Sequence, residues 1–580
     1  MVHSFMRRGV PALALLSLLA AGPAFGRAGS AHAVPHQESG TPVQLLALND
    51  LHGNLMPVDG AAGRITHRGP AVQAGGLAQM ATLLDAARLG QANSLTVAAG
   101  DMIGGSPLTS AIFHDEPAVD ALEHLGLSAS SVGNHEFDEG PRELRRIAEG
   151  GCHPEDGCAP GGPYDGAGFA YLAANVTERG STTPLLRPYT VKTLPSGQRI
   201  GFIGLVTKDA PSVINASMVR DVQFHDEVPT IARYSRELTR QGVHAQVLLI
   251  HEGEAVDGRA GAACDEGGPG ARLEGRIKDI ARQAAPAVDL IVSGHSHASY
   301  ECTVTGPDNR PRLVTQADSF GRSFTDLRFS LDPRGDVVRD TVRATHRPVP
   351  VTTARQPAMS RLIETWQSRS KDTAERVVGH ISADIPGRGS TLPETPLGSL
   401  IADAQVAAGR PHGAQLALLN PGGMRADLVH REGGEVTYAD AYRVQPFETP
   451  LWVLPVTGEQ LLTALRQQFT GANEASPRFL QLSRELSYSV DMSRSGADRL
   501  LADTVRVGGQ PVDPGATYKV VLNEFLANGG NGFTVFGEIT ARQGGDTTDL
   551  EALVHYLQAT TSAARPAAPP APGRITFVTR

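Results

Sequence analysis

The chain has little excess charge of either sign. Its 580 residues include 52 Lys and Arg against 61 Asp and Glu, which gives a formal net charge of -9 at pH 7. A protein that binds long nucleic acid through the phosphate backbone needs a strongly basic surface. The composition therefore argues against long nucleic acid as a partner.

Long apolar runs are also scarce. The first 33 residues have the features of a secretory signal peptide: Arg7 and Arg8, a proline-interrupted apolar stretch at Val10–Phe25, and an Ala-His-Ala cleavage site at residues 31–33. That stretch is shorter than the ~20 residues of a spanning helix, which disfavours a stable membrane anchor. The C-terminal residues show no hydrophobic anchor signal. We expect a secreted protein, extracellular or periplasmic, exported by either the general or the twin-arginine route.

Cysteine is rare, with four in the chain. Cys152 and Cys158 share one Gly/Pro-rich loop, and Cys264 and Cys302 lie further along. Local pairing, 152 with 158 and 264 with 302, is the simplest of three possible connectivities. The alternative is a zinc site that uses Cys152, His153 and Cys158, which an oxidising compartment disfavours.

The length exceeds what one hydrophobic core supports, since cores rarely grow beyond ~250 to 300 residues. Hydrophobic residues at 41% and charged residues at 19% are ordinary for a globular protein, and 64 Gly with 40 Pro indicate many short loops. We therefore expect two large domains.

The first part of the chain alternates short β-rich runs with helical segments, which favours an α/β (α+β) fold with sheets covered by helices. The predicted strands are Val43–Leu48, Ser94–Ala99, Ser130–Val132, Phe169–Val176, Ile200–Val206, Ala245–Ile250 and Leu290–Val292. The predicted helices are Gly75–Leu89, Pro117–Leu125, Glu227–Gln241 and Ala271–Ala284.

A polar, amphipathic segment at Arg355–Val377 predicts a linking helix, after which a second domain begins. Its predicted strands are Gln415–Leu419, Pro450–Val456 and Tyr518–Asn523, and its predicted helices are Leu397–Ala408 and Thr457–Phe469. The C-terminal tail is expected to be a loose end or a late strand at Arg574–Val578.

Polar side chains follow the predicted strands of the first domain. Five of them come directly after a strand end: Asp50, Asp101, Asn134, His251 and His295. Loops at the carboxyl edge of a sheet gather into one site. We expect these residues to lie close together.

Five stretches carry this chemistry: Asn49-Asp50-Leu51-His52-Gly53, Ala99-Gly100-Asp101, Gly133-Asn134-His135-Glu136, Ile250-His251-Glu252-Gly253 and Gly294-His295-Ser296-His297. Carboxylates, a carboxamide and imidazoles together suit a pair of borderline divalent ions, namely Zn, Mn or Fe, rather than Ca or Mg. In Asp50-x-His52 and His295-x-His297, the two-residue spacing would point both side chains the same way if the backbone is extended. A bridging Asp would hold two ions ~3.5 to 4 Å apart, a spacing suited to displacement at phosphorus.

The ordered pattern D-x-H, G-D, G-N-H-E, H and G-H-x-H resembles the calcineurin-like metallophosphoesterases. The motifs Asn420–Arg425 and Asn528–Phe533 resemble the C-terminal domain of the secreted 5'-nucleotidase family, which includes bacterial UDP-sugar hydrolases. The similarity extends over Val43–Phe536. It implies a metallophosphoesterase β-sandwich flanked by helices at 41–348, a linking helix at 355–377, a separate α/β substrate-binding domain at 378–563 and a tail at 564–580.

The resemblance also implies roles for individual residues. One metal ion would be bound by Asp50, His52, Gln316 and His297, the other by Asn134, His251 and His295, with Asp101 bridging them. His135 would face the substrate phosphate and stabilise charge in the transition state, held by Asp138. The nucleophile would be a metal-bound water or hydroxide.

In the second domain the resemblance implies substrate recognition. Phe447 and Phe525 match two rings that sandwich the base, Arg425 matches a phosphate-binding arginine, and Asn420 lies in the same motif. Asn531 stands where Asp usually meets the ribose hydroxyls, Pro421 replaces a Gly or Asn, and no Arg precedes Glu394. Arg388 is the expected substitute for that second phosphate ligand.

The resemblance predicts a secreted dinuclear-metal phosphohydrolase that removes phosphate from 5'-nucleotides. The same metal site could instead serve a 2',3'-cyclic nucleotide phosphodiesterase or a nucleotide-sugar pyrophosphohydrolase, and a more remote alternative is a surface binding protein without activity. Because metals and base pocket belong to different domains, catalysis should require domain closure, with the hinge at Arg355–Val377. The oligomeric state stays open.

Overall fold

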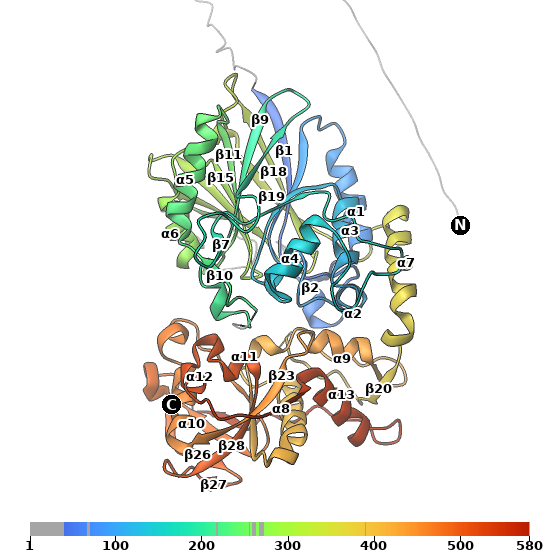
Figure 1. Cartoon of the computed structure of the whole chain (residues 1–580), viewed down its shortest axis with the longest axis vertical. Coiled ribbons are helices and arrows are strands. Elements are labelled where there is room, and N and C mark those ends of the chain that lie inside the picture. The colour runs from blue at the N-terminus through green and yellow to red at the C-terminus, as the bar shows by residue number, and fades with distance from the viewer. Residues whose placement is uncertain are drawn as a thin grey trace, which may run out of the picture. The chain divides into compact units, whose positions relative to one another are not determined.

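A computed structural model describes residues 40–66, 70–215, 218–254, 256–257, 263–265, 272–388 and 390–578 (Figure 1). The predicted signal peptide lies outside the described residues. The described chain is mixed α/β, with a two-sheet sandwich followed by a separate C-terminal domain, as predicted.

Two sheets form the N-terminal sandwich. The first has the order β19 (Arg343–Pro348), β18 (Ser323–Leu331), β1 (Thr41–Leu48), β4 (Ser94–Ala99), β5 (Leu127–Ser131) and β6 (Ala170–Leu172). The second has the order β13 (Ala263–Asp265), β16 (Ser299–Thr305), β17 (Pro311–Ala317), β15 (Leu290–Ser293), β11 (Ala245–His251), β9 (Arg199–Val206) and β8 (Tyr189–Thr193). Strands β1, β4, β5 and β6 run parallel, as do β9, β11 and β15, so their carboxyl ends share one edge of each sheet.

Alternate residues of β1 enter different cores. Val43 and Leu45 pack in the cluster between the two sheets, whereas Leu46 and Leu48 pack in the cluster that contains the helices of the outer face. This two-residue period is what a strand buried on both faces requires. The helices over the first sheet include α1 (Leu77–Arg88) and α3 (Glu116–His124), and α5 (Glu227–Arg240) and α6 (Gly275–Gln283) cover the second.

The predicted helices of this domain are confirmed, with one shortened. Helix α6 begins at Gly275 because β14 (Arg272–Leu273) precedes it. The predicted strand at Phe169–Val176 is wrong as one element, since β6 ends at Leu172 and Val176 begins β7 (Val176–Glu178). The buried amide of Asn175 explains the break, because its Nδ2 donates to the carbonyls of Val206 (2.6 Å) and His225 (3.1 Å) and turns the chain.

The linking helix is α7 (Pro357–Ala374), shorter than predicted. Its Met359 and Ile363 belong to the core cluster of the N-terminal domain, and Trp366 Nε1 donates to Asp120 (3.1 Å). Strand β20 (Val377–His380) then pairs within the second domain. The chain therefore leaves one domain for the other between α7 and β20.

The C-terminal domain is built on a five-stranded sheet. Its order is β24 (Gln481–Leu482), β21 (Leu416–Leu419), β28 (Thr517–Asn523), β23 (Pro450–Thr457) and β29 (Gln543–Thr548), with helices α8 (Pro396–Gly409), α10 (Gly458–Gln467) and α13 (Asp549–Thr560). A second sheet has the order β27 (Gln510–Pro511), β26 (Leu500–Val507), β25 (Leu486–Val490) and β30 (Ile575–Phe577). The tail is thus the late strand of the two predicted alternatives, since β30 pairs with β25.

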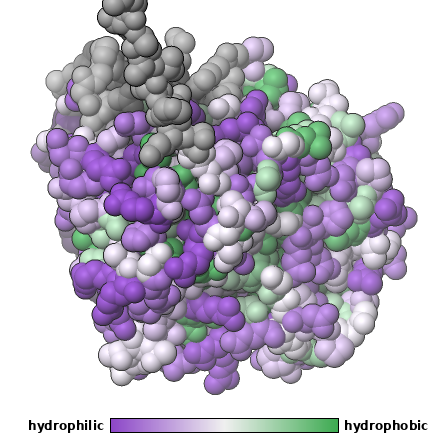
Figure 2. All heavy atoms as spheres, turned by 90° about the horizontal axis from the view of Figure 1, so that it is seen from above, coloured by the Kyte–Doolittle hydropathy of each residue, from purple (hydrophilic) through white to green (hydrophobic). Residues whose placement is uncertain are grey.

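Two disulfides join Cys152 to Cys158 and Cys264 to Cys302, which confirms the predicted pairing. The alternative zinc site is wrong, because both thiols of the loop are consumed by the disulfide. Among the residues that the structure describes, no helix combines the length and apolar character needed to cross a bilayer. The face seen in Figure 2 is mostly hydrophilic, with hydrophobic residues in smaller patches.

Candidate metal centre and substrate cleft

The five residues that follow strand ends do converge. Asp50 follows β1, Asp101 follows β4, His251 ends β11 and His295 follows β15, so all of them reach the common carboxyl edge of the sandwich. Several adopt left-handed backbone, with φ of 49° at Asp50, 50° at Asp101 and 79° at His295. Such conformations cost of order 1 kcal/mol each outside glycine and gather where function requires them.

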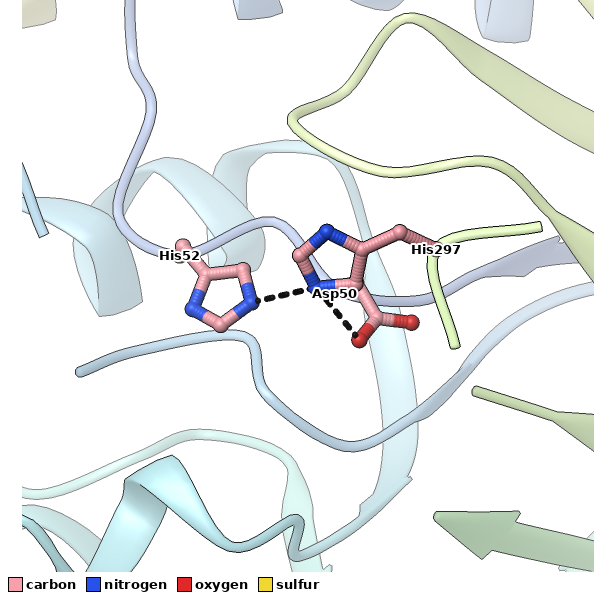
Figure 3. Close-up of side chains that lie close together, drawn as sticks. All are labelled: Asp50, His52 and His297. Atoms are coloured by element: carbon pink, nitrogen blue, oxygen red, sulfur yellow. Dashed lines mark hydrogen bonds and ion pairs between the residues drawn. The ribbon is translucent and has the colours of Figure 1, made fainter. Parts of the chain in front are cut away.

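Three overlapping groups of ligand atoms result, of which two consist of predicted metal ligands. In the first, atoms of Asp50, His52 and His297 lie within 4.8 Å of one another. His52 Nε2 lies 3.1 Å from His297 Nε2, which in turn lies 3.3 Å from Asp50 Oδ1 (Figure 3). The side chains come from two loops 245 residues apart and point toward one another. This is a donor set suited to a borderline divalent ion.

The second cluster contains Asp101, His251 and His295. His251 Nε2 lies 3.0 Å from Asp101 Oδ2, and Asn134 Oδ1 lies 2.9 Å from His295 Nδ1. The same oxygen of Asp101 is 3.7 Å from His52 Nε2 in the first cluster. Asp101 therefore lies between the two clusters, where a bridging ligand would have to be.

Hydrogen bonds at the far side of the imidazoles test whether a cation fits. His251 Nδ1 is 2.8 Å from the carbonyl oxygen of Ala99, and His52 Nδ1 is 2.9 Å from that of Gly104, so in both rings Nδ1 carries the proton. When the His251 ring is neutral, the lone pair of its Nε2 points at Asp101 Oδ2, 3.0 Å away. This contact is unfavourable unless a cation or a proton lies between the two atoms. The residues fit a metal centre.

Electrostatics point the same way. Burial by itself lowers the pKa of His251, but the carboxylates of Asp101 and Asp50 raise it to about 10. The site therefore favours positive charge at this position, which divalent ions would supply.

Close backbone approach explains the glycine of the Gly133-Asn134 run. A Cβ at Gly133 would lie 2.2 Å from Asp101 Oδ1, inside contact distance. Only glycine lets the loop after β5 approach the loop after β4 so closely.

His135 belongs to the third group, in which ligand atoms of His52, Asp101 and His135 lie within 4.8 Å of one another. Its Nδ1 is 2.9 Å from Asp138 Oδ2, and its ring meets His52 edge-on with centroids 4.9 Å apart. Burial lowers its pKa, but Asp138 and Asp101 more than compensate, so the net shift is upward. The imidazolium form that could face a phosphate is favoured.

Gln316, the remaining predicted ligand, makes other contacts. Its Oε1 accepts hydrogen bonds from Ser296 Oγ (3.2 Å) and Tyr300 OH (3.1 Å), and its Nε2 donates to Ser296 Oγ (3.0 Å). The bonds to Ser296 attach Gln316 to the Gly294–His297 loop. Its role as a metal ligand stays a prediction.

The structure adds Glu136, whose role the motif did not reveal. Its buried carboxylate accepts backbone N–H groups from Asp101 (2.9 Å), Met102 (2.8 Å) and Gly133 (2.5 Å). It thereby ties together the loops after β4 and β5. A carboxylate directly after the motif histidine, in a segment otherwise buried, was the signal available in the sequence.

A cavity of about 570 Å³ adjoins the metal clusters. All six residues predicted to contact substrate line it: Arg388, Asn420, Arg425, Phe447, Phe525 and Asn531. Residues of the metal centre line it too, including Asp101, Asn134, His295 and His297. Arg478, which the motifs did not single out, is a further lining residue.

Phe447 and Arg425 reach furthest toward the metal centre. The ring of Phe447 stacks on that of His135, with centroids 5.5 Å apart and planes 9° apart. Arg425 lies over the ring of Phe447, with its Cζ 5.6 Å from the ring centroid. Arg425 Nη2 is 3.4 Å from His52 Nε2. A phosphate here could be met by a guanidinium and by the metal clusters together.

Asn531 and Phe525 are held on the C-terminal side of the cavity. Asn420 Nδ2 donates to Asn531 Oδ1 (3.4 Å), and Asn420 Oδ1 accepts from Asn523 Nδ2 (3.1 Å). A Cβ at Gly530 would lie 2.5 Å from the ring of Phe525, so glycine is required beneath that ring. The amides and the ring thus line one cavity from two segments, one at Asn420 and one at residues 523–531.

Comparison with known proteins agrees with this geometry. Residues 43–299 match the family model for calcineurin-like phosphoesterases, and residues 377–538 match that for the 5'-nucleotidase C-terminal domain. Cell wall protein Lmo0130 of Listeria monocytogenes is 32% identical over 89% of this chain and 67% of its own length. Endonuclease YhcR of Bacillus subtilis is 29% identical over 89% of this chain, which spans only 40% of that relative.

Among solved structures, a 5'-nucleotidase precursor from Thermus thermophilus matches 93% of this chain and 100% of its own chain. The TM-score is 0.76 and the sequence identity 28%. The likeness therefore extends over both domains.

Proposed function

The chain belongs to the 5'-nucleotidase family of calcineurin-like phosphoesterases and is a metal-dependent phosphoric ester hydrolase, and from this we propose that it removes phosphate from 5'-nucleotides. The observation that carries the proposal is the joint lining of one cavity by the metal clusters, His135 and the Phe447–Arg425 pair. Phosphate chemistry and base recognition would then occur on one small substrate. We place the domains at 41–348 and 378–563, with 355–377 linking them.

Two divalent ions, Zn, Mn or Fe, would be held by the clusters. Asp50, His52 and His297, with Gln316 behind them, would serve one ion, and Asn134, His251 and His295 the other, with Asp101 shared. When bound, such ions lower the pKa of water and polarise phosphoryl oxygens. Water attack at phosphorus is the step that this chemistry serves.

The protein's own residues supply positioning and charge. His135, kept protonated by Asp138, would stabilise the charge that develops on the phosphoryl group. Arg425 would grip a phosphate oxygen with its planar fork. Phe447 and Phe525 would sandwich the base, and Asn531 with Asn420 would hydrogen-bond the ribose hydroxyls as neutral groups.

We further propose that the protein acts outside the cytoplasm. The signal-like N-terminus and the two disulfides support this, since disulfides persist in oxidising compartments. Detection of the protein in the culture medium or periplasm, with a mature N-terminus near residue 34, is the direct measurement.

A second candidate deserves a place in the same test because the cleft is rich in guanidinium groups. Arg388, Arg425 and Arg478 all line it. So much positive charge also suits a diphosphate. This favours a nucleotide-sugar pyrophosphohydrolase over a cyclic phosphodiesterase as the alternative.

The test is a substrate panel of AMP, ATP, UDP-glucose and 2',3'-cAMP with Mn²⁺- or Zn²⁺-loaded protein, followed by chromatography of the products, because UDP-glucose would give UMP and glucose 1-phosphate and 2',3'-cAMP would give a nucleoside monophosphate. We expect AMP to give the highest kcat/KM, with His135→Ala as the inactive control. Higher kcat/KM on UDP-glucose would replace the nucleotidase proposal with the pyrophosphohydrolase. Absence of turnover on every ester at full metal occupancy would reject both.

A further inference from the structure

Arg478 lines the substrate cleft but has no role in the proposed removal of the 5'-phosphate. Its side chain is exposed and, within the described part of the chain, forms no ion pair and no hydrogen bond. The carboxylate of Glu254 acts on it electrostatically, from beyond ion-pair distance. A guanidinium has five N–H donors and no acceptor. Arg478 therefore presents donors and positive charge to whatever enters the cleft.

The backbone on either side of Arg478 is fixed. The buried Gln468 accepts the Arg478 N–H at its carbonyl oxygen (3.2 Å) and the Leu480 N–H at its Oε1 (2.8 Å). Between them, the ring of Phe479 packs edge-on against that of Phe469, with centroids 5.4 Å apart. The guanidinium is therefore held on a rigid base, so binding a ligand has to order only its own side chain.

Three amides on the same side of the cavity form a chain of hydrogen bonds with one direction. The backbone N–H of Leu526 donates to Asn523 Oδ1 (2.9 Å), and Asn523 Nδ2 donates to Asn420 Oδ1 (3.1 Å). Asn420 Nδ2 then donates to Asn531 Oδ1 (3.4 Å). Because a backbone N–H can only donate, the Leu526 N–H fixes the orientation of all three amides.

This orientation leaves the Asn531 amide nitrogen free. The Asn531 Oδ1 is occupied by Asn420, and among the described residues its Nδ2 has no acceptor, although Asn531 is only 9% exposed. A nearly buried donor without a partner is unfavourable, and a ligand that brings an acceptor into the cavity would satisfy it. Asn531 therefore offers N–H groups, where a carboxylate would offer acceptors.

Arg478 and Asn531 lie on adjoining segments. Asn473, shortly before Arg478 in the chain, donates from its Nδ2 to the carbonyl oxygen of Asn531 (2.9 Å). The Glu524 carboxylate, which also lines the cavity, already accepts a hydrogen bond from Asn215 Nδ2 (2.6 Å). This side of the cavity thus combines a cation with unpaired N–H donors, and the complement of such a set is an anion that can only accept hydrogen bonds.

The hydrolysed phosphate is expected elsewhere in the cavity. Arg425 Nη2 is 3.4 Å from His52 Nε2 and so reaches the metal centre, whereas Arg478 makes no such contact within the described residues. The proposed function places the ribose hydroxyls at Asn531. A phosphate on one of these hydroxyls would bring three acceptor oxygens and about -1.5 to -2 charges to the Asn531 side of the cavity.

We propose that Arg478 and Asn531 bind a second phosphate, carried on the ribose 2' or 3' oxygen, while the 5'-phosphate of the same nucleotide is hydrolysed. The choice of the ribose oxygens rests on the proposed function. The substrate class would be nucleoside bisphosphates: water attacks the 5' phosphorus, the 5' P–O bond breaks, and the products are phosphate and the nucleoside 2'- or 3'-phosphate. AMP stays a substrate, because the Asn531 N–H groups can also donate to a hydroxyl oxygen.

The test compares kcat/KM on AMP, adenosine 3',5'-bisphosphate, adenosine 2',5'-bisphosphate and ADP. Mn²⁺-loaded wild type, Arg478→Ala and Arg410→Ala are measured, and chromatography identifies the products. Arg410 is the matched control, because it is an exposed arginine that follows α8 in the same domain and does not line the cavity. Calorimetry with His135→Ala, alone and combined with Arg478→Ala, gives dissociation constants for the same four compounds without turnover.

We expect wild type to prefer at least one of the two bisphosphates to AMP. Arg478→Ala should lower that preference by ~10-fold or more, the effect of losing a charge-assisted hydrogen bond, and Arg410→Ala should keep it. An unchanged preference in Arg478→Ala would overturn the proposal. A loss confined to ADP, or release of the ribose phosphate in place of the 5'-phosphate, would overturn it too.

The second phosphate site and the proposed function can fail separately. If AMP is not hydrolysed at full metal occupancy, the nucleotidase proposal fails. Tighter binding of a bisphosphate than of AMP to His135→Ala, lost when Arg478→Ala is added, would still support the second phosphate site. If AMP is hydrolysed but the bisphosphates bind no more tightly than AMP, the function stands and the second site is rejected.

Discussion

His135 Nδ1 lies 2.9 Å from Asp138 Oδ2, across a single turn of chain. The preceding residue, Asn134, faces the other way, with its Oδ1 2.9 Å from His295 Nδ1. Adjacent side chains therefore face different partners: Asn134 lies against a histidine of the proposed metal centre, and His135 lies against a carboxylate that raises the pKa of its imidazole. Substitutions at Asn134 and at His135 should therefore have different effects.

Asn134→Ala and His135→Ala should fail in different ways. Loss of the Asn134 carboxamide removes a metal ligand, so metal content should fall along with kcat. Loss of His135 removes transition-state stabilisation, so kcat should fall by ~10² or more at unchanged metal content. Elemental analysis beside steady-state kinetics separates the two, and equal metal loss in both variants would contradict the assignment.

Asp138→Asn should lower kcat, by roughly 10-fold or more, and by less than His135→Ala. The amide keeps the hydrogen bond to His135 Nδ1 but removes the charge that stabilises the imidazolium. Combining Asp138→Asn with His135→Ala provides the control: if Asp138 acts through His135, the double variant should be no slower than His135→Ala. Additive losses would show an independent role for Asp138.

Glu136→Gln should destabilise the metal loops. The carboxylate accepts N–H groups from Asp101, Met102 and Gly133, and one end of an amide would point N–H groups at these donors. A buried unsatisfied donor costs about 1 to 3 kcal/mol. Metal affinity measured by competition with a chelator should fall, whereas an unchanged affinity would mean that the loops hold without this anchor.

Phe447→Ala should affect nucleotides selectively. Stacking of one base on an aromatic ring contributes ~1 to 3 kcal/mol, or roughly 5- to 150-fold in kcat/KM. A substrate without any aromatic ring, such as ribose 5-phosphate, has no such contact and serves as the control. Because Phe447 also stacks on His135, equal loss on both substrates would instead indicate that its role is to position the histidine.

The chemistry-bearing residues could be predicted because their pattern depends on local rules. Asp50, Asp101 and His295 follow apolar strand runs, and parallel strands bring their carboxyl ends to one edge. The pattern of apolar residues alone predicted the helix found at Glu227–Arg240 and the strand found at Ala245–His251. Motif order then allowed a family resemblance to specify the remainder.

Features that depend on tertiary contact could not be predicted. The break between β6 and β7 comes from the amide of Asn175 meeting Val206 and His225, partners 31 and 50 residues away. Glu136 acts on backbone that only the folded loops bring near. The stack of His114 on His153 likewise joins two segments, which no spacing in the sequence encodes.

Asp549 provides a test of pH dependence away from the metal centre. It is 1% exposed at the start of α13, its Oδ1 accepts N–H groups from Thr449 (3.0 Å) and Leu550 (2.9 Å), and its Oδ2 has no hydrogen-bond partner within the described part of the chain. Burial raises the pKa of this carboxyl to about 7.

Between about pH 4 and 7 the unfolded chain would therefore release the Asp549 proton while the folded chain keeps it, so this group makes stability fall as pH rises.

Asp549→Asn keeps an acceptor for the two N–H groups and cannot ionise. Its stability relative to wild type should increase by roughly 2 kcal/mol between pH 5 and pH 7, because each pH unit in this range contributes about 1.4 kcal/mol. Urea denaturation across this range measures it, with Asp546→Asn, whose side chain is 79% exposed, as the matched control that should show no such trend. A constant difference at every pH would mean that Asp549 stays ionised in the fold, held by the backbone N–H groups and the N-terminus of α13.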